Sequence, residues 1–263
     1  MRWFTAFFWL GWTAWAYRRR WRAFPTVIRA GLALSMAGQW ALLALDGQWS
    51  AQTALPLHLC AVSALLCMPA GLWRSRRALA WQLHLGAPCA ALALCFPAVI
   101  ASSRPALMEL CFFSLHALIL CAALWQAADA LARREPLPAD GRGTLVAANA
   151  YLAVVSAFNR AFDTNYLFLR RAPAGTPLAT MAAGGAAGYL AALELGTILL
   201  LTLTGVLYGE VNRRALSRPA DRPPPPCPPR ASATAPRAPC RAHAAAAGQA
   251  RRAHRRDSRA RRA

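Results

Sequence analysis

The stretch Leu55-Pro56-Leu57-His58-Leu59-Cys60 opens an apolar run that continues to Trp73. A run of this length, close to about 20 residues, is typical of a helix that crosses a membrane. It places a histidine and a thiol two residues apart, about one turn inside the predicted helix. Ionisable side chains are costly at such a depth and usually face the protein interior or a cavity. His58 and Cys60 are therefore the first candidates for a functional site.

Apolar residues are unusually abundant in the chain as a whole. The 263 residues are 57% hydrophobic and 15% charged, whereas soluble domains are about 45–50% apolar and about 25% charged. The apolar residues form continuous blocks instead of recurring at helical or alternating intervals, which is the pattern that a lipid bilayer imposes. The predicted fold is an all-α, polytopic transmembrane helix bundle.

Seven apolar blocks define the predicted spans. They cover residues 1–17, 27–45, 55–73, 78–100, 106–131, 144–162 and 187–211. The first block is shorter than the about 20 residues of a full span, so it is either a short span or an interfacial anchor. We expect about seven spans in residues 1–212, followed by a separate tail in residues 213–263.

The net charge of +20 comes entirely from arginine, because the 30 basic residues include no lysine. Outside the tail, most arginines lie in short clusters at residues 18–22, 74–77 and 133–142. Clusters between apolar blocks indicate membrane topology, and they do not form the basic groove of a nucleic-acid-binding domain. We predict a multi-pass protein of the cell membrane, with the N-terminus outside and the C-terminus in the cytoplasm. No specific nucleic-acid partner is expected.

The tail contains fourteen of the arginines, together with many prolines and alanines. Its composition lacks the apolar content that a packed core needs, so we predict disorder. Near a membrane surface such a tail can hold anionic lipid head groups, at roughly 1 kcal/mol per arginine. A solvated tail with no specific role is the alternative. The sequence does not indicate an oligomeric state.

Six of the eight cysteines lie inside apolar blocks, where thiols usually serve as small apolar side chains. No Cys-x-x-Cys pair and no zinc-ligand spacing is present. The sequence therefore predicts neither a disulfide framework nor a structural metal site, and it gives no sign of a cofactor.

The predicted topology brings polar residues of several spans to the outer half of the bundle. The candidates are His58, Cys60, His116, Asn159, Asp163, Asn165 and Glu194. An ionised carboxylate such as Glu194 needs a partner at this depth. We expect these residues to line an outward-facing polar cavity that is open to membrane lipids.

Three motifs in this set resemble the YwaF family of bacterial integral membrane proteins, whose function is unassigned. They are Leu55–Cys60, Phe112-Phe113-x-x-His116, and Asn159-x-x-x-Asp163-Thr164-Asn165-Tyr166-Leu167-Phe168-Leu169. Asp163 stands where that family has glycine, and Leu167 where it has methionine. The resemblance covers roughly residues 55–211. It implies a more distant similarity to eukaryotic multi-span proteins regarded as thiol-dependent phospholipid acyltransferases, with Cys60 and His116 as catalytic residues.

A nucleophilic thiol requires a base, since the thiolate is the reactive form. On one continuous helix His58 would lie about 200° round from Cys60. His116 is therefore the better predicted base for lipid acyl transfer or hydrolysis, with Asn159 or Asp163 orienting it. The alternative is that Cys60 is an inert buried cysteine.

Two other functional hypotheses use the same polar residues. Intramembrane His58, His116, Asp163 and Glu194 are typical of a proton or small-molecule transport path. Imidazole and carboxylate groups also suit a metal. However, no two of them share a helix at the i, i+4 spacing, so we predict no metal site. A bundle with neither catalytic nor transport activity is the remaining alternative.

Overall fold

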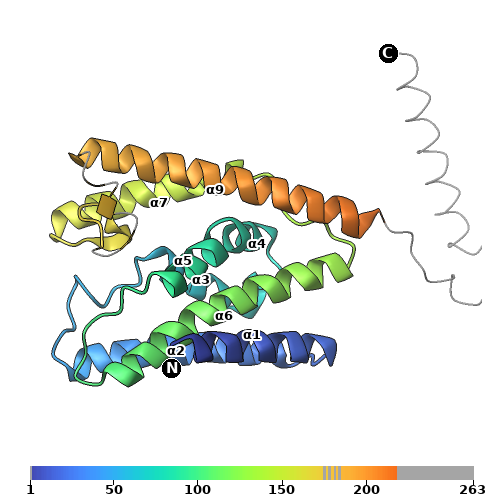
Figure 1. Cartoon of the computed structure of the whole chain (residues 1–263), viewed down its shortest axis with the longest axis horizontal. Helices are drawn as coiled ribbons and strands as arrows, with labels where there is room; N and C mark the ends of the chain where they lie inside the picture. Colours follow the sequence, from blue (N-terminus) through green and yellow to red (C-terminus); the bar gives the residue numbers. More distant parts are fainter. Residues whose placement is uncertain (1, 174–175, 177–178, 181, 183–184, 218–263) are drawn as a thin grey trace, which may run out of the picture. The chain divides into compact units, whose positions relative to one another are not determined.

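The computed structural model describes residues 2–173, 176, 179–180, 182 and 185–217. All regular structure in these residues is helical (Figure 1). The helices are α1 (Arg2–Arg18), α2 (Phe24–Leu45), α3 (Leu59–Cys67), α4 (Arg76–Trp81), α5 (Ala87–Cys95), α6 (Pro105–Ala132), α7 (Arg142–Ala161) and α9 (Gly185–Leu216). Short 3-10 turns lie at η1 (Ala70–Leu72) and η3 (Tyr166–Phe168), and a π-helical turn, η2 (Gln82–Gly86), joins α4 to α5. The predicted all-α fold is confirmed.

Each of the seven predicted apolar blocks contains helix. In the fourth block α4, η2 and α5 run on as one helix from Arg76 to Cys95. Within the described part of the chain, four helices are long and apolar enough to cross a membrane. They are Phe24–Leu45, Arg76–Cys95, Pro105–Ala132 and Gly185–Leu216. The chain thus has the helices of a polytopic membrane protein.

The predicted third span departs most from expectation, because only Leu59–Cys67 is helical. His58 is the residue before the helix, with extended backbone angles of φ −79° and ψ 147°. Two tyrosine hydroxyls bind the backbone just upstream, at Leu55 and Leu57, and Pro69 follows soon after the last helical residue. The expectation that His58 and Cys60 share one helix is therefore wrong.

The predicted fourth span is also shorter than expected, since α5 ends at Cys95 and not near Ile100. Phe96 adopts φ −125° and ψ 72°, because the ring of Pro97 disfavours helical geometry in the residue before it.

Helix α6 is the centre of the bundle and packs against α1, α2, α3 and α5. The central cluster of buried side chains comes mainly from α2, α3 and α6: Phe24, Ile28, Leu32, Met36, Ala64, Cys67, Leu115, Leu118, Ile119, Cys121, Ala122 and Trp125. Trp9 of α1 joins this core through its indole N–H, which donates to Ser114 Oγ at 3.2 Å. In a bilayer such helix association depends on close packing and interhelical hydrogen bonds.

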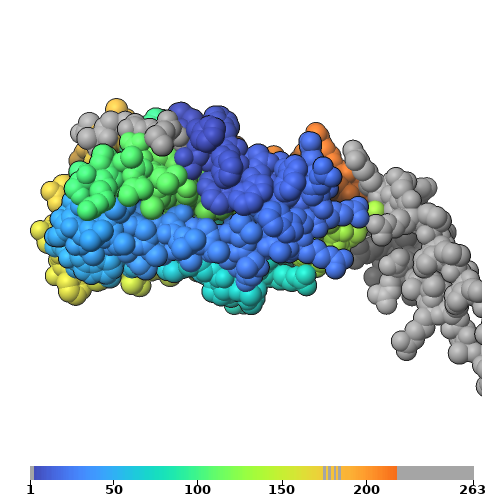
Figure 2. Space-filling model, turned by 90° about the horizontal axis from the view of Figure 1, so that it is seen from below, coloured from blue at the N-terminus to red at the C-terminus, as the bar shows by residue number. Residues whose placement is uncertain are grey.

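Apolar side chains also cover the outside of the bundle. Figure 2 shows a face on which α1, α2 and part of α6 lie. Phe4 and Phe7 of α1 and Leu34 of α2 are exposed. On α9 the exposed side chains include Leu195 and Leu203. A helix that is apolar on its outward side fits a lipid environment.

The arginine-rich connections lie together. Figure 1 shows the α1–α2 turn, the α6–α7 loop and the end of α9 at one end of the bundle. Helix α9 continues to Leu216, so Arg213 and Arg214 belong to it, and both pair with Glu210. Residues 218–263 lie outside the described residues, and the disordered tail stays a prediction. So does the orientation in the membrane.

The end of α2 is fastened to the start of α6 by one carboxylate. Asp46 accepts hydrogen bonds from Ser102 Oγ at 2.6 Å, from Ser103 N–H at 3.1 Å and from Ser103 Oγ. Arg104 lies 3.6 Å from the same carboxylate. The hydroxyl of Ser102, followed by that of Ser103, holds the pKa of Asp46 below its ordinary value.

We expect the contribution of Asp46 to stability to depend on pH. A carboxyl whose pKa is lowered by folding stabilises the protein above the unfolded pKa of about 3.9, and the contribution is lost as the pH falls through the still lower folded pKa. Thermal unfolding in detergent should show the wild type melting above Asp46→Asn at neutral pH, with the gap closing below about pH 4. A gap that is independent of pH would contradict this.

Helix α9 approaches the α6–α7 loop at Gly205, where an added Cβ would lie 2.7 Å from the carbonyl oxygen of Ala139. Gly205→Ala should lower the apparent melting temperature, because backbone must move at an overpacking cost of about 1–3 kcal/mol. Gly209→Ala is the control, since nothing lies within 4 Å of its Cβ position. Equal melting temperatures for the two variants would show that the approach is looser than described.

Candidate functional site

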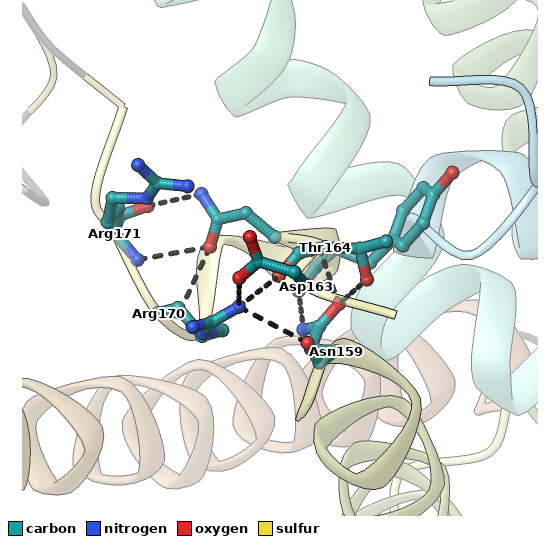
Figure 3. Close-up of polar contacts among 7 residues, drawn as sticks. Asn159, Asp163, Thr164, Arg170 and Arg171 are labelled. Atoms are coloured by element: carbon teal, nitrogen blue, oxygen red, sulfur yellow. Dashed lines mark hydrogen bonds and ion pairs between the residues drawn. The ribbon is translucent and has the colours of Figure 1, made fainter. Parts of the chain in front are cut away.

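The loop after α7 is organised by the buried amide of Asn159 (Figure 3). Asn159 Oδ1 accepts hydrogen bonds from Tyr166 N–H at 2.9 Å and Thr164 Oγ1 at 2.6 Å. Its Nδ2 donates to the carbonyl of Tyr166 at 2.9 Å. The amide thus ties the end of α7 to η3. Its polar atoms are engaged by the loop, not by another predicted site residue.

Two more polar side chains of this loop, Asn165 and Asp163, also bind groups within the loop. Asn165 Oδ1 accepts from the N–H groups of Arg170 and Arg171, each at 3.0 Å, and its Nδ2 donates to the carbonyl of Arg171 at 2.8 Å. Asp163 is exposed and pairs with the guanidinium of Arg170 (Figure 3), which lowers the pKa of its carboxyl. Asp163 also has a left-handed φ of 49°, a conformation that suits glycine best.

This loop meets the Leu55–Cys60 segment through Tyr166. The Tyr166 hydroxyl accepts from Leu55 N–H at 3.0 Å and donates to the carbonyl of Ala51 at 2.8 Å. The imidazole of His58 contacts the rings of Tyr166 and Phe168, with centroids 5.1 and 5.2 Å away. Its Nδ1 accepts a long hydrogen bond, 3.4 Å, from Leu167 N–H. Two of the three motifs, far apart in sequence, therefore form one structural unit.

His116 is buried in the middle of α6. Its Nδ1 lies 2.7 Å from the carbonyl oxygen of Phe112, one turn earlier. A carbonyl oxygen only accepts, so Nδ1 carries the proton and Nε2 keeps the lone pair in the neutral ring. The ring of Phe112 lies 4.2 Å from the imidazole.

Cys60 is the second residue of α3 and a half-buried free thiol. It packs against the central cluster, to which α3 and α6 both contribute. Helices α3, α5 and α6 pack on one another, and we call their junction, with Cys60 and His116 as the predicted pair, the thiol–histidine site. No hydrogen bond of the described residues joins Cys60 Sγ to His116.

Glu194 lies apart from the histidines. It accepts a hydrogen bond from Asn149 Nδ2 at 3.0 Å, which links α9 to α7. Neither Glu194 nor Asp163 is joined to His58 or His116 by a hydrogen bond or ion pair of the described residues. In the same part of the chain, no three His, Cys, Asp or Glu residues are grouped so that they could hold a metal ion.

Sequence reasoning did not show that two tyrosines bind the segment before α3. Besides Tyr166, Tyr151 of α7 donates to the carbonyl of Leu57 at 2.9 Å. Tyr166 lies inside a quoted motif, but only the fold shows which segment its hydroxyl reaches. His84 also sits outside the site: it is buried in η2, with Nδ1 2.6 Å from Thr204 Oγ1 and Nε2 3.0 Å from the carbonyl of Pro138.

The membrane-length apolar helices, the lipid-compatible outer surface and the polar cluster at the start of α3 define an integral membrane protein of the helical-bundle class. The chain belongs to the TMEM164 family, which matches residues 2–208. No curated protein and no solved structure matches the chain. Membership of a family of multi-span membrane proteins is thereby confirmed. The more specific resemblance to YwaF proteins and to acyltransferases stays a prediction.

The hydrogen bonds of Asn165 predict how the loop responds to trypsin. Asn165→Ala removes the acceptor for two backbone N–H groups, and such losses cost about 1–3 kcal/mol. Cleavage after Arg170 and Arg171 should therefore accelerate about tenfold, as measured by peptide mapping of the solubilised protein. Asn149→Ala, an amide on α7 outside the loop, should leave the cleavage rate unchanged. The same rate in both variants would rule out this role of Asn165.

Proposed function

We propose that this protein transfers acyl groups between membrane lipids, with Cys60 as the nucleophile and His116 as the general base. One observation supports the proposal: Cys60 lies in the first turn of α3, which packs on α6, and Nδ1 of the buried His116 in α6 carries the proton, which leaves Nε2 as the basic nitrogen. The resemblance of Leu55–Cys60 and Phe112–His116 to motifs linked with thiol-dependent acyl transfer supports it. So does the lipid environment that the apolar helices imply.

The start of α3 favours this chemistry. Leu59, Cys60 and Ala61 provide backbone N–H groups that have no acceptor among the described residues. Unpaired N–H groups and the helix dipole stabilise negative charge, first on the thiolate and then on an oxyanion. His58 does not cap the helix with its side chain, so these donors stay available.

The proposed reaction has two steps. In the first, Nε2 of His116 accepts the thiol proton while Cys60 Sγ attacks the carbonyl carbon of a lipid ester. The tetrahedral intermediate breaks the ester C–O bond, and the imidazolium returns the proton to the departing alkoxide. In the second step a lipid hydroxyl or water attacks the thioester, His116 accepts its proton, and the thiol is restored. Catalytic hydrogen bonds are often absent before substrate binds and form in the complex.

Transport through His58, His116, Asp163 and Glu194 is the alternative function, and it has less support. Asp163 pairs with Arg170 at the exposed loop, and Glu194 pairs with Asn149. A transport path needs these groups to exchange protons or substrate in sequence, and no described hydrogen bond connects them. Proton flux into proteoliposomes that depends on Glu194 but not on Cys60 would favour transport.

The full chain reconstituted in vesicles should transfer a labelled acyl chain from a phospholipid to a lysophospholipid. Cys60→Ala and His116→Gln should each reduce the rate at least about 100-fold, since nucleophile and base act together. Cys121→Ala is the control, because Cys121 is a buried thiol of α6 with no proposed part in the reaction, and this variant should retain the rate. Hydroxylamine at neutral pH should release the label from the protein, as expected for a thioester.

An equal rate with alanine at position 60 would exclude the thiol mechanism. Absence of both acyl transfer and transport in folded wild-type protein would favour a non-catalytic bundle.

A further inference from the structure

A second site lies at the opposite end of α3 from Cys60. There a cavity of about 200 Å³ opens between the start of α4 and the end of α6. Its lining includes Trp73, Arg74, Arg76, Gln126 and Arg133, and we call it the arginine cavity. It belongs to the end of the bundle whose arginine clusters are predicted to face the cytoplasm.

The arginine cavity carries an excess of positive charge. Three arginines line it, against the two carboxylates Asp129 and Glu135. Both carboxylates are bound by the guanidinium of Arg133. Arg76 uses one N–H to bind the carbonyl of Pro136 at 2.9 Å, and Arg74 makes no hydrogen bond or ion pair within the described residues. Two guanidinium groups therefore remain available to an anion, and guanidinium groups match phosphate oxygens well.

One residue of the lining also has an unsatisfied acceptor. Gln126 is only 4% exposed, and its Oε1 has no hydrogen-bond partner among the described residues. The Nε2 of the same amide donates to Cys67 Sγ at 3.7 Å, a weak interaction. A buried amide oxygen without a donor is costly, so a ligand that offers an O–H or N–H beside its phosphate would complete this site.

Size and location restrict the ligand further. Pockets for drug-sized molecules hold about 300–1,000 Å³, so a cavity of about 200 Å³ admits a polar head group but no lipid tails. Trp73 is part of its lining, and tryptophan is enriched at membrane–water interfaces. Basic pockets between membrane helices are suited to lipid phosphates.

We propose that the arginine cavity binds the head group of an anionic phospholipid that carries a hydroxyl or ammonium donor. Its phosphate lies between Arg74 and Arg76, its donor faces Gln126 Oε1, and its acyl chains remain in the bilayer. The site is separate from the thiol–histidine site and does not depend on the proposed acyl transfer.

Native mass spectrometry of the detergent-solubilised full chain tests the proposal with phosphatidylglycerol as the probe. All variants are compared in about 0.5 M ammonium acetate, which weakens nonspecific binding to exposed arginines, including those of the tail. The Arg74→Gln, Arg76→Gln double variant should weaken binding about tenfold or more. Arg77→Gln is the matched control, because Arg77 neighbours Arg76 but does not line the cavity, and it should bind as the wild type does.

Gln126→Met tests the donor contact separately. This variant should weaken binding of phosphatidylglycerol and leave that of phosphatidic acid, whose head group has no alcohol, unchanged. The single variant Arg74→Gln controls for misfolding of the double variant, because Arg74 makes no hydrogen bond or ion pair within the described residues that the fold requires. Equal weakening by Arg77→Gln, or none by the double variant, would overturn the site. If soluble glycerophosphate binds as tightly as the lipid does, the ligand of this site is a free phosphate compound and not a membrane lipid.

Discussion

The hydroxyl of Tyr166 joins two segments that lie 111 residues apart in the chain, and the site depends on this contact. In an apolar environment every backbone polar group needs a partner. The segment before α3 leaves the helical path, so its N–H and C=O groups must be satisfied by other means. Tyr166 does this for Leu55 and Ala51, and Tyr151 for Leu57. By holding this segment in place, the tyrosines fix where α3 begins and hence where Cys60 lies.

Much of the fold follows from the sequence because bilayer helices are long apolar blocks. All seven predicted blocks contain helix, and α6 matches its block almost to the residue. Prediction failed where an apolar block is not one helix. Residues 55–73 read as continuous, but Pro56 and Pro69 flank a helix that covers only Leu59–Cys67. The bonds that keep the flanking residues non-helical come from distant parts of the chain, and local composition does not contain them.

The candidate site was predictable to a similar extent. The motifs identified His58, Cys60 and His116, and the fold places His58 and Cys60 at the start of α3 and His116 in the middle of α6. The roles of the amides were beyond the sequence, because Asn159 and Asn165 satisfy backbone groups of their own loop. Whether an asparagine faces a ligand or a turn is decided by geometry that neither spacing nor composition encodes. The arginine clusters are similar: their pattern indicated topology, but not that two of them line the same cavity.

Three residues of the loop after α7, Asp163, Leu167 and Phe168, hold left-handed backbone angles without being glycine. Such angles cost about 1–2 kcal/mol each, or about 3–6 kcal/mol together. The six hydrogen bonds of the Asn159 and Asn165 side chains offset this, at about 0.5–1.5 kcal/mol each. These opposing quantities are of similar size. The strained backbone of the loop is thus supported by two asparagine side chains, and replacing either asparagine would leave part of that strain uncompensated.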